Sequence, residues 1–395
     1  MFAQTRFSHL LRLIPQDFFR NAVQQSSGDR YAKRFSSWDL LVTMIYGQLH
    51  QVKSLRTLAT AFSALDTHHD HLNTQAMGRS TLSDALHKRS AEPFRLLCEE
   101  LLKGVKREQR QSCRKMISLI DSTSITLRGP GFDEWTQATR TRVTQGLKVH
   151  VVLDPQQYAP TYVNVTPANV NDLSDALQLP LQAGMTYVFD KGYCDYNWWH
   201  QIDQSGAHFV TRLKRNAHFS PVSRQSITAE VEGVIAADDL VCLSKKHLNK
   251  KRINQYRQQP VRRIEVVRED HDTPLVLVTN DFSRSAMEIA DLYRQRWQIE
   301  LFFKWIKQKL NLKRYLGFSE NAVRIQIYCA LITYLLMSLY RTLVGYRGSL
   351  SEMNIKLVHS LLERPAAILR RRRQRDAERQ ASQQYQLPLA TFTGH

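Results

Sequence analysis

The sequence predicts an α/β protein in which a mixed β-sheet follows a helical N-terminal segment. Residues 1–115 carry apolar side chains at helical spacing, whereas β-branched and alternating patterns begin at residue 116. From there to residue 214 the expected elements follow the order βββαβαβ, which fits three hairpin-connected strands followed by right-handed crossovers. With 395 residues, 43% of them hydrophobic and 23% charged, the chain is long enough for two or three folded domains.

The N-terminal segment contains several short helices. Residues 38–46 have apolar side chains at helical spacing, Ser54 suits the N-cap of a following helix, and another helix starts near residue 79. Two short helices separated by the polar stretch 66–78, with a basic end, suggest a helix-turn-helix-like DNA reader. An ordinary small helical bundle explains the same pattern equally well, so both interpretations stay open.

The sheet is expected to begin with five strands and two helices. The strands are expected at residues 116–127, 146–154, 161–166, 185–190 and 208–214. Asp172 suits the N-cap of a short helix over 172–181, and a second helix covers 196–204. Each helix lies between two strands, as a crossover connection requires.

The remainder of the chain is expected to return to β-structure and then to helices. Strands are expected at 240–243, 263–268 and 275–279, one long helix at 285–312, and a buried apolar helix near 325–341. The resulting domain prediction is a helical N-terminal domain at 1–115, a core in two parts at 116–218 and 283–345, a β-rich insertion at 219–282, and a basic C-terminal tail at 346–395.

The charge balance points to a polyanionic partner. The chain has 55 Lys and Arg against 36 Asp and Glu, a formal net charge of +19, which favours nucleic acid or an anionic membrane surface. Membrane insertion is a poor explanation, because the longest apolar run covers only residues 325–340 and a span needs about 20 residues. The N-terminus lacks the order of a signal peptide, so we expect a cytoplasmic location. Five dispersed cysteines without a CxxC pair argue against disulfides and structural zinc.

Two aspartates follow apolar strands. Asp121 lies at the end of the apolar part of the first strand, and Asp190 ends the fourth strand. If these strands are neighbours, the carboxylates meet at the sheet edge where open α/β sheets place ligands. Adjacent carboxylates repel unless one is protonated or a cation intervenes, so Mg²⁺ is the natural occupant. Gly192 would allow a tight turn after Asp190. Taken singly, either aspartate could be an ordinary cap or loop acid.

The predicted helix 285–312 carries one polar side. At 100° per residue, four of its polar residues fall within a sector of about 60°, and apolar side chains occupy most of the remaining circumference. A helix that is apolar nearly all round is buried, so this side must face something polar. This side carries one acid flanked by two bases and a tyrosine. The acid could serve as a third metal-ligating carboxylate, and the neighbouring groups could bind phosphate. A buried Arg296–Glu300 ion pair is the simpler alternative. The four residues are Tyr293, Arg296, Glu300 and Lys307.

This spacing, Tyr-x2-Arg-x3-Glu-x6-Lys, resembles the signature of the DDE transposases of insertion sequence family four. The segments beginning at Asp121 and Asp190 match the other two acidic blocks, and the segments at Ser54 and Arg79 resemble the DNA-binding region. The resemblance covers about residues 5–340. It implies an RNase H-like core in which Asp121, Asp190 and Glu300 are catalytic and bind two Mg²⁺ ions, with Mn²⁺ as a substitute.

The same resemblance implies the partners and the reaction. Tyr293, Arg296 and Lys307 would hold the phosphates of double-stranded DNA at the transposon ends. The reaction would be cut-and-paste transposition into target DNA, through a hairpin at the excised end, by a homodimer that joins two ends. Trp297, beside these residues, either packs in the core, which its type favours, or stacks on a DNA base.

Two other functions would use many of the same residues. A non-catalytic DNA-binding repressor, or an inactivated relative, would keep the basic surface but gives no reason for Glu300 in an apolar helix. An RNase H-like nuclease without strand transfer would share the three acids but would not need two recognised ends. Terminal inverted repeats flanking the coding region would favour the transposase.

Overall fold

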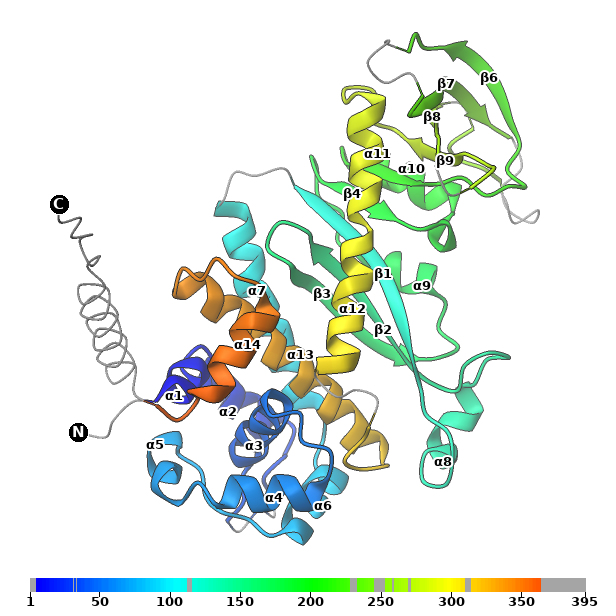
Figure 1. The fold of residues 1–395 in the computed structure, drawn as a ribbon. Coiled ribbons are helices and arrows are strands. Elements are labelled where there is room, and N and C mark those ends of the chain that lie inside the picture. Colours follow the sequence, from blue (N-terminus) through cyan, green and yellow to red (C-terminus); the bar gives the residue numbers. More distant parts are fainter. Residues whose placement is uncertain are drawn as a thin grey trace, which may run out of the picture.

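The computed structural model describes residues 5–363, except 31, 33, 112–115, 228–232, 245–252, 258, 269–270 and 310–313. Short helices form the N-terminal third, which lies at one end of the molecule in Figure 1. Ser36 and Asp39 form a capping box at the start of α3, and Ser54 caps α4 as expected. The described N-terminal helices are α1 (Arg6–Leu11), α2 (Gln16–Gln25), α3 (Ser37–Leu49), α4 (Leu55–Ser63), α5 (His69–Leu72), α6 (Arg79–Lys88) and α7 (Glu92–Gln111), with a 3-10 turn η1 (Asp66–His68).

One mixed sheet of nine strands forms the rest of the framework, in the order β3-β2-β1-β4-β5-β9-β8-β7-β6. Strands β1, β2 and β3 pair antiparallel, and β1, β4 and β5 pair parallel. This half of the sheet has the topology of an RNase H-like fold, as predicted. The strands are β1 (Ile117–Thr126), β2 (Gly146–Asp154), β3 (Ala159–Pro167), β4 (Thr186–Phe189), β5 (His208–Arg212), β6 (Phe219–Arg224), β7 (Ile235–Leu243), β8 (Pro260–Val266) and β9 (Leu275–Thr279).

Helices cover both faces of the sheet. The crossover helices α9 (Asp172–Ala176) and α10 (Tyr196–Gln204) bury Ile120, Tyr187 and Phe189 on one face, together with Trp198 and Trp199 of α10 itself. On the other face pack α11 (Ala286–Gln295), α12 (Trp297–Lys309) and α13 (Glu320–Leu343). The short elements α8 (Asp133–Thr136), η2 (Gln137–Thr139) and η3 (Lys191–Tyr193) lie in connections, and α14 (Leu350–His359) packs on α13.

The predicted buried helix is α13. It packs against α3, α6 and α7 of the N-terminal segment and against β3 of the sheet, so it links the two regions. Within the described residues it is the one helix long and apolar enough to cross a membrane, yet 89% of its most apolar stretch is buried inside the protein. These contacts make α13 a core helix.

The predicted helix at 285–312 is interrupted. The structure divides it into α11 and α12 at Arg296, whose N–H donates to the carbonyl of Tyr293 and whose carbonyl accepts from Ile299. Both are i to i+3 hydrogen bonds, so the helix tightens locally to a 3-10 turn. The angular positions predicted from an unbroken helix are therefore wrong across this point.

The segment 219–282 extends the sheet. Strand β9 pairs antiparallel with β5, and β8, β7 and β6 follow outward, at the opposite end of Figure 1 from the N-terminal helices. The predicted strands correspond to β7, β8 and β9, whereas β6 was not predicted because all its residues are exposed and it contains Pro221. Proline is tolerated at such an edge position. The basic stretch 245–252 and the tail from residue 364 lie outside the described residues.

Candidate active site

The first two predicted carboxylates lie on neighbouring parallel strands. Ile120 of β1 is in register with Phe189 of β4, so the next residues, Asp121 and Asp190, come side by side. Asp121 still belongs to β1, whereas Asp190 is the first residue after β4. The sequence predicted that the two carboxylates would be close if their strands were neighbours, and the strands are neighbours.

Asp190 is held by the turn that follows it. It is the N-cap of η3, and its Oδ1 accepts the N–H of Gly192 at 2.6 Å. A Cβ atom on Gly192 would lie 2.8 Å from that same oxygen. A larger residue here would therefore displace the Asp190 carboxylate, which approaches the backbone closely.

Asp121 is largely buried, with 22% of its side chain exposed. Its Oδ1 accepts the N–H of Ser122 at 2.8 Å. The pKa of Asp121 is raised to about 6, chiefly by burial and also by the negative charges of Asp190 and Glu300, against the opposing effects of the Ser122 N–H and Arg296. Asp121 is thus close enough to both other predicted acids to be affected by their charges.

One guanidinium joins Asp121 to the third predicted acid. Nη2 of Arg296 donates to Oε1 of Glu300 at 2.7 Å, and Nη1 lies 3.9 Å from Oδ2 of Asp121. The Arg296–Glu300 ion pair therefore exists, and it lies beside the first aspartate rather than in a separate place. Among the described residues, no three acidic, histidine or cysteine side chains are close enough together to hold a metal ion in this conformation.

Tyr293 and Lys307 flank this group. Tyr293 is buried, and its ring centroid lies 5.6 Å from Cζ of Arg296. The Tyr293 hydroxyl and the Arg296 Nε are buried without a hydrogen-bond partner among the described residues. Lys307 is half-buried on α12 and shares a small hollow with Thr123 and other side chains of the sheet. All the predicted site residues thus lie on β1, after β4, or on α11 and α12.

Part of α12 is more exposed than predicted. Ile299, Phe302 and Ile306 are buried, but Trp297 is 59% exposed and Leu301 is 46% exposed. The expectation that Trp297 packs in the core is wrong, because only one side of α12 lies on the sheet. Trp297 follows Arg296 in the sequence, and its side chain lies at the surface.

The sequence did not reveal a second polar contact beside Asp121. Asp172 accepts a hydrogen bond from Ser122 Oγ at 2.7 Å and lies 3.0 Å from Lys148 Nζ. The predicted N-cap role of Asp172 is wrong, since Asn171 caps α9 by accepting from the N–H of Leu173. No local signal in the sequence revealed this contact, because Ser122 is one of several hydroxyl residues in β1.

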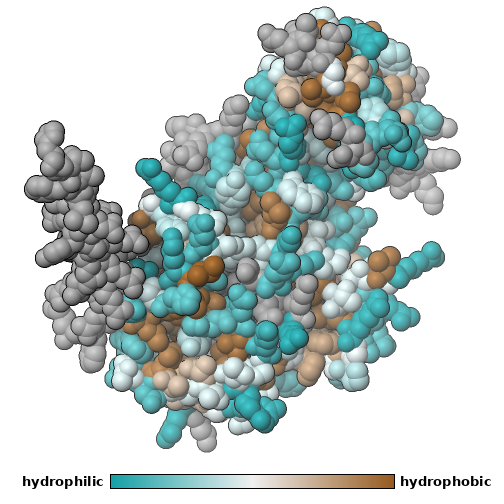
Figure 2. Space-filling view, in the orientation of Figure 1, coloured by the Kyte–Doolittle hydropathy of each residue, from teal (hydrophilic) through white to brown (hydrophobic). Residues whose placement is uncertain are grey.

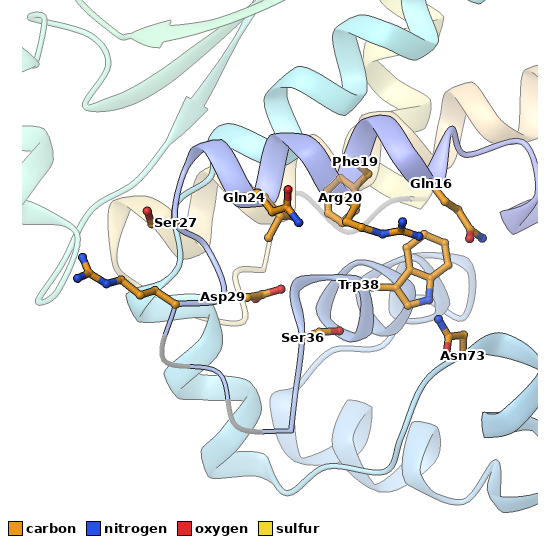
Figure 3. Close-up of a pocket in the computed structure, with 11 residues that line it drawn as sticks. Gln16, Phe19, Arg20, Gln24, Ser27, Asp29, Ser36, Trp38 and Asn73 are labelled. Carbon is orange, nitrogen blue, oxygen red and sulfur yellow. The ribbon is translucent and has the colours of Figure 1, made fainter.

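A hollow in the N-terminal helices is separate from these residues. It has a volume of about 590 Å³, and in Figure 3 Gln16, Arg20 and Gln24 of α2 line one side while Trp38 of α3 lies opposite. The Trp38 indole N–H donates to the carbonyl of Leu72 at 3.1 Å. No predicted site residue lines this hollow.

A family model described as the transposase DDE domain matches residues 112–336. The chain belongs to the DDE transposase family. This range contains all three predicted acids, and the predicted resemblance to transposases of insertion sequences is confirmed. A second model, described as a domain of unknown function, matches residues 3–73.

Curated relatives of this chain are also described as transposases. A putative transposase y4zB of Sinorhizobium fredii is 42% identical over 266 residues, which cover 66% of this chain and 70% of the relative. A probable transposase for insertion sequence element IS5377 of Geobacillus stearothermophilus is 26% identical over 336 residues, covering 84% of each chain. Among solved structures, a piggyBac transposase synaptic complex with hairpin DNA matches with a TM-score of 0.48 at 10% identity, covering 92% of this chain and 80% of that one.

Proposed function

We propose that this transposase binds the ends of its insertion sequence and catalyses Mg²⁺-dependent DNA strand cleavage and strand transfer. The observation that carries the proposal is the position of Arg296, which contacts carboxylates from β1 and α12 beside the strand end that holds Asp190. Three acids far apart in the sequence are thus gathered at one edge of an RNase H-like sheet.

The chemistry of these side chains fits a hard divalent cation. Carboxylate oxygens are the ligands that Mg²⁺ prefers, and a cation would offset the repulsion by which Asp190 and Glu300 raise the pKa of Asp121. Asp121, Asp190 and Glu300 would hold two Mg²⁺ ions, or Mn²⁺ in their place. When bound, such ions activate the attacking hydroxyl and stabilise the leaving 3′-oxygen during in-line attack on phosphorus.

Arg296 has two tasks in this proposal. Without cations its guanidinium neutralises Asp121 and Glu300, which would otherwise repel each other. With cations bound to these acids, the guanidinium would be available for a phosphate, to which arginine binds through two parallel hydrogen bonds. The buried Tyr293 hydroxyl, which lacks a partner among the described residues, and Lys307 would bind neighbouring phosphate oxygens.

The proposed partners are the two transposon ends and a target duplex, in a complex that contains two copies of this chain. The net charge of +19 favours such a polyanion. We place this activity in the cytoplasm, where the element and its target DNA are found.

The experiment is incubation of the purified protein with a labelled end-bearing fragment, target plasmid and Mg²⁺. Hairpinned ends and joined products are expected from the wild type and not from a Glu300→Gln variant. Nicked ends without joined products would support a nuclease that lacks strand transfer, and end binding without cleavage would support a DNA-binding relative. Equal cleavage by both proteins would remove Glu300 from the proposed site.

A further inference from the structure

The connection between β1 and β2 presents three arginines around one hollow. Arg128, Arg140 and Arg142 are exposed, and with Thr141 and Gln145 they line a hollow of about 670 Å³. None of them belongs to the predicted catalytic or phosphate-binding residues. In Figure 2, hydrophilic side chains project from the side of the molecule where Figure 1 places this connection and its helix α8.

The connection that carries these arginines is well braced. Oδ1 of Asp133 accepts from the N–H of Gly129 at 3.1 Å and from Nε2 of Gln145 at 2.6 Å, and this Nε2 also lies 2.8 Å from Oγ1 of Thr136. Gly146, where β2 begins, has φ +135°, and a Cβ there would lie 2.2 Å from the carbonyl oxygen of Ile125. A braced loop loses little conformational entropy when it binds a ligand.

The charges around the hollow are almost all positive. The side-chain hydrogen bond that Arg128 makes is to the carbonyl of Val143, at 3.3 Å. Within the described ranges, no acidic side chain forms an ion pair with any of the three arginines. Of the two acids in the connection, Asp133 is occupied by the bracing bonds, and Glu134 lines the neighbouring groove. Three unneutralised guanidinium groups around one hollow suit a polyanion with several phosphates.

The position of the hollow narrows the choice of polyanion. The neighbouring groove, of about 590 Å³, has Gly131 and Trp135 of the connection on one side and Arg79 and His87 of α6 on the other. The connection is fixed there because the Trp135 indole N–H donates to the carbonyl of Phe318 at 2.9 Å. The connection that carries the arginines therefore also borders α6, the second helix of the predicted DNA reader.

The distance to the candidate active site matches a short run of duplex. Arg128 follows Asp121 by seven positions in the sequence, most of them in β1, so a rise of about 3.3 Å per residue puts the two at most about 23 Å apart. At about 3.4 Å per nucleotide, this corresponds to about seven base pairs of DNA.

We propose that Arg128, Arg140 and Arg142 hold the phosphate backbone of the transposon-end duplex, within about seven base pairs of the cleaved position. The inference rests on the proposed function. It assigns the end rather than the target duplex to this hollow, because the connection that carries the hollow also lines a groove with α6, and a single duplex can contact both.

The test compares DNA binding by an Arg140→Gln/Arg142→Gln variant with the wild type, both carrying Glu300→Gln to prevent cleavage. Arg128 is left in place because it bonds the backbone of the loop. End binding, measured by fluorescence anisotropy at several salt concentrations, is expected to weaken by about tenfold or more, with a salt slope shallower by about one to two units. A matched Arg20→Gln/Arg347→Gln variant removes two exposed charges from α2 and from the α13–α14 connection and is expected to bind as the wild type.

A second measurement locates the contact on the DNA. End duplexes with neutral methylphosphonate linkages, placed one at a time, are expected to bind the wild type more weakly when the linkage lies within about seven positions of the cleaved end. The arginine variant is expected to be insensitive to the same linkages. An unchanged salt slope, or equal sensitivity of both proteins, would overturn the proposal, and weakened binding of target plasmid alone would reassign the hollow to the target. These readouts record binding, so they are separable from a failure of the catalytic proposal, which cleavage by Glu300→Gln would reveal.

Discussion

Nη1 of Arg296 lies 3.9 Å from Oδ2 of Asp121, although the two residues are far apart in the sequence. The contact exists because α12 crosses the face of β1 just where the helix tightens at Arg296. It brings Glu300, one helical turn further on, to the same edge of the sheet as Asp190. The predictions below test what this arrangement does.

Removing the third acid should separate cleavage from binding. In a Glu300→Ala variant, Mg²⁺-dependent cleavage is expected to fall by more than about 100-fold, since losing even a group that only supports a metal ligand costs about 10- to 100-fold. End binding should stay within about threefold of wild type, because Arg296 and Lys307 remain. Gel assays of cleavage and anisotropy measure the two quantities. Asp291→Asn, an exposed acid on α11 paired with Arg294, is the control and should cleave normally.

Lys307 should contribute to binding through one phosphate. A Lys307→Ala variant is expected to bind the end about three- to tenfold more weakly, with a salt slope shallower by about 0.9. Lys103→Ala removes an exposed lysine that pairs with Glu100 on α7 and should change neither value. A wild-type slope in the Lys307 variant would contradict its phosphate-binding role.

The turn after Asp190 should matter for catalysis more than for folding. In a Gly192→Ala variant the new methyl group would lie 2.8 Å from Oδ1 of Asp190, so the carboxylate must move. Displacements of this size cost catalysis about 10- to 100-fold, whereas the change in melting temperature should be small. Gly104→Ala, on α7 with nothing within 4 Å of the added carbon, is the matched control. Normal cleavage by the Gly192 variant would show that Asp190 is not needed in its observed position.

The buried charge of Asp121 should destabilise the metal-free protein. Its pKa is raised from the ordinary 3.8 to about 6, so the folded state binds a proton more readily than the unfolded state does. Stability contributed by this group therefore falls as the pH rises from about 4 to about 6, by about 2 to 3 kcal/mol in all. An Asp121→Asn variant in EDTA should thus be more stable than wild type at pH 8 and equal to it near pH 4.

Thermal or urea unfolding at several pH values measures this difference. Added Mg²⁺ should stabilise the wild type and not the Asp121→Asn variant, because binding to the folded state alone raises its stability. A variant that is less stable than wild type at pH 8 would mean that the carboxylate serves the fold rather than a cation.

The sequence predicted strands β1, β2 and β9 and helix α10 closely, because each has a regular pattern with clear ends. It could not place β6, whose side chains are all exposed, or the tightening at Arg296, which depends on hydrogen bonds within a single turn. Trp297 was placed in the core because tryptophan is usually buried, but α12 contacts the sheet on one side only.

The candidate site was predictable in its residues and not in its geometry. The local sequence pattern identified Asp121 and Asp190 as acids at strand ends and Glu300 as an acid on one face of a helix. Whether the three side chains come close to one another depends on the pairing of β1 with β4 and on the path of α12. The contact of Asp172 with Ser122 joins two elements far apart in the chain, so no local signal distinguished it from a helix cap. The arginine hollow could not be predicted either, since Arg128 and Arg140 are brought to one hollow only by the fold of the connection between β1 and β2.

The pairing of β9 with β5 limits how this transposase can be shortened by protein engineering. Replacing residues 219–282 with a short linker would strip β5 of its outer neighbour and leave a row of unpaired amide and carbonyl groups along the strand. Such an open border recruits other chains and leads to aggregates. Keeping β9 alone would only move the open border from β5 to β9, so a trimmed version would need a protected outer strand, as the proline-containing β6 is in the full chain.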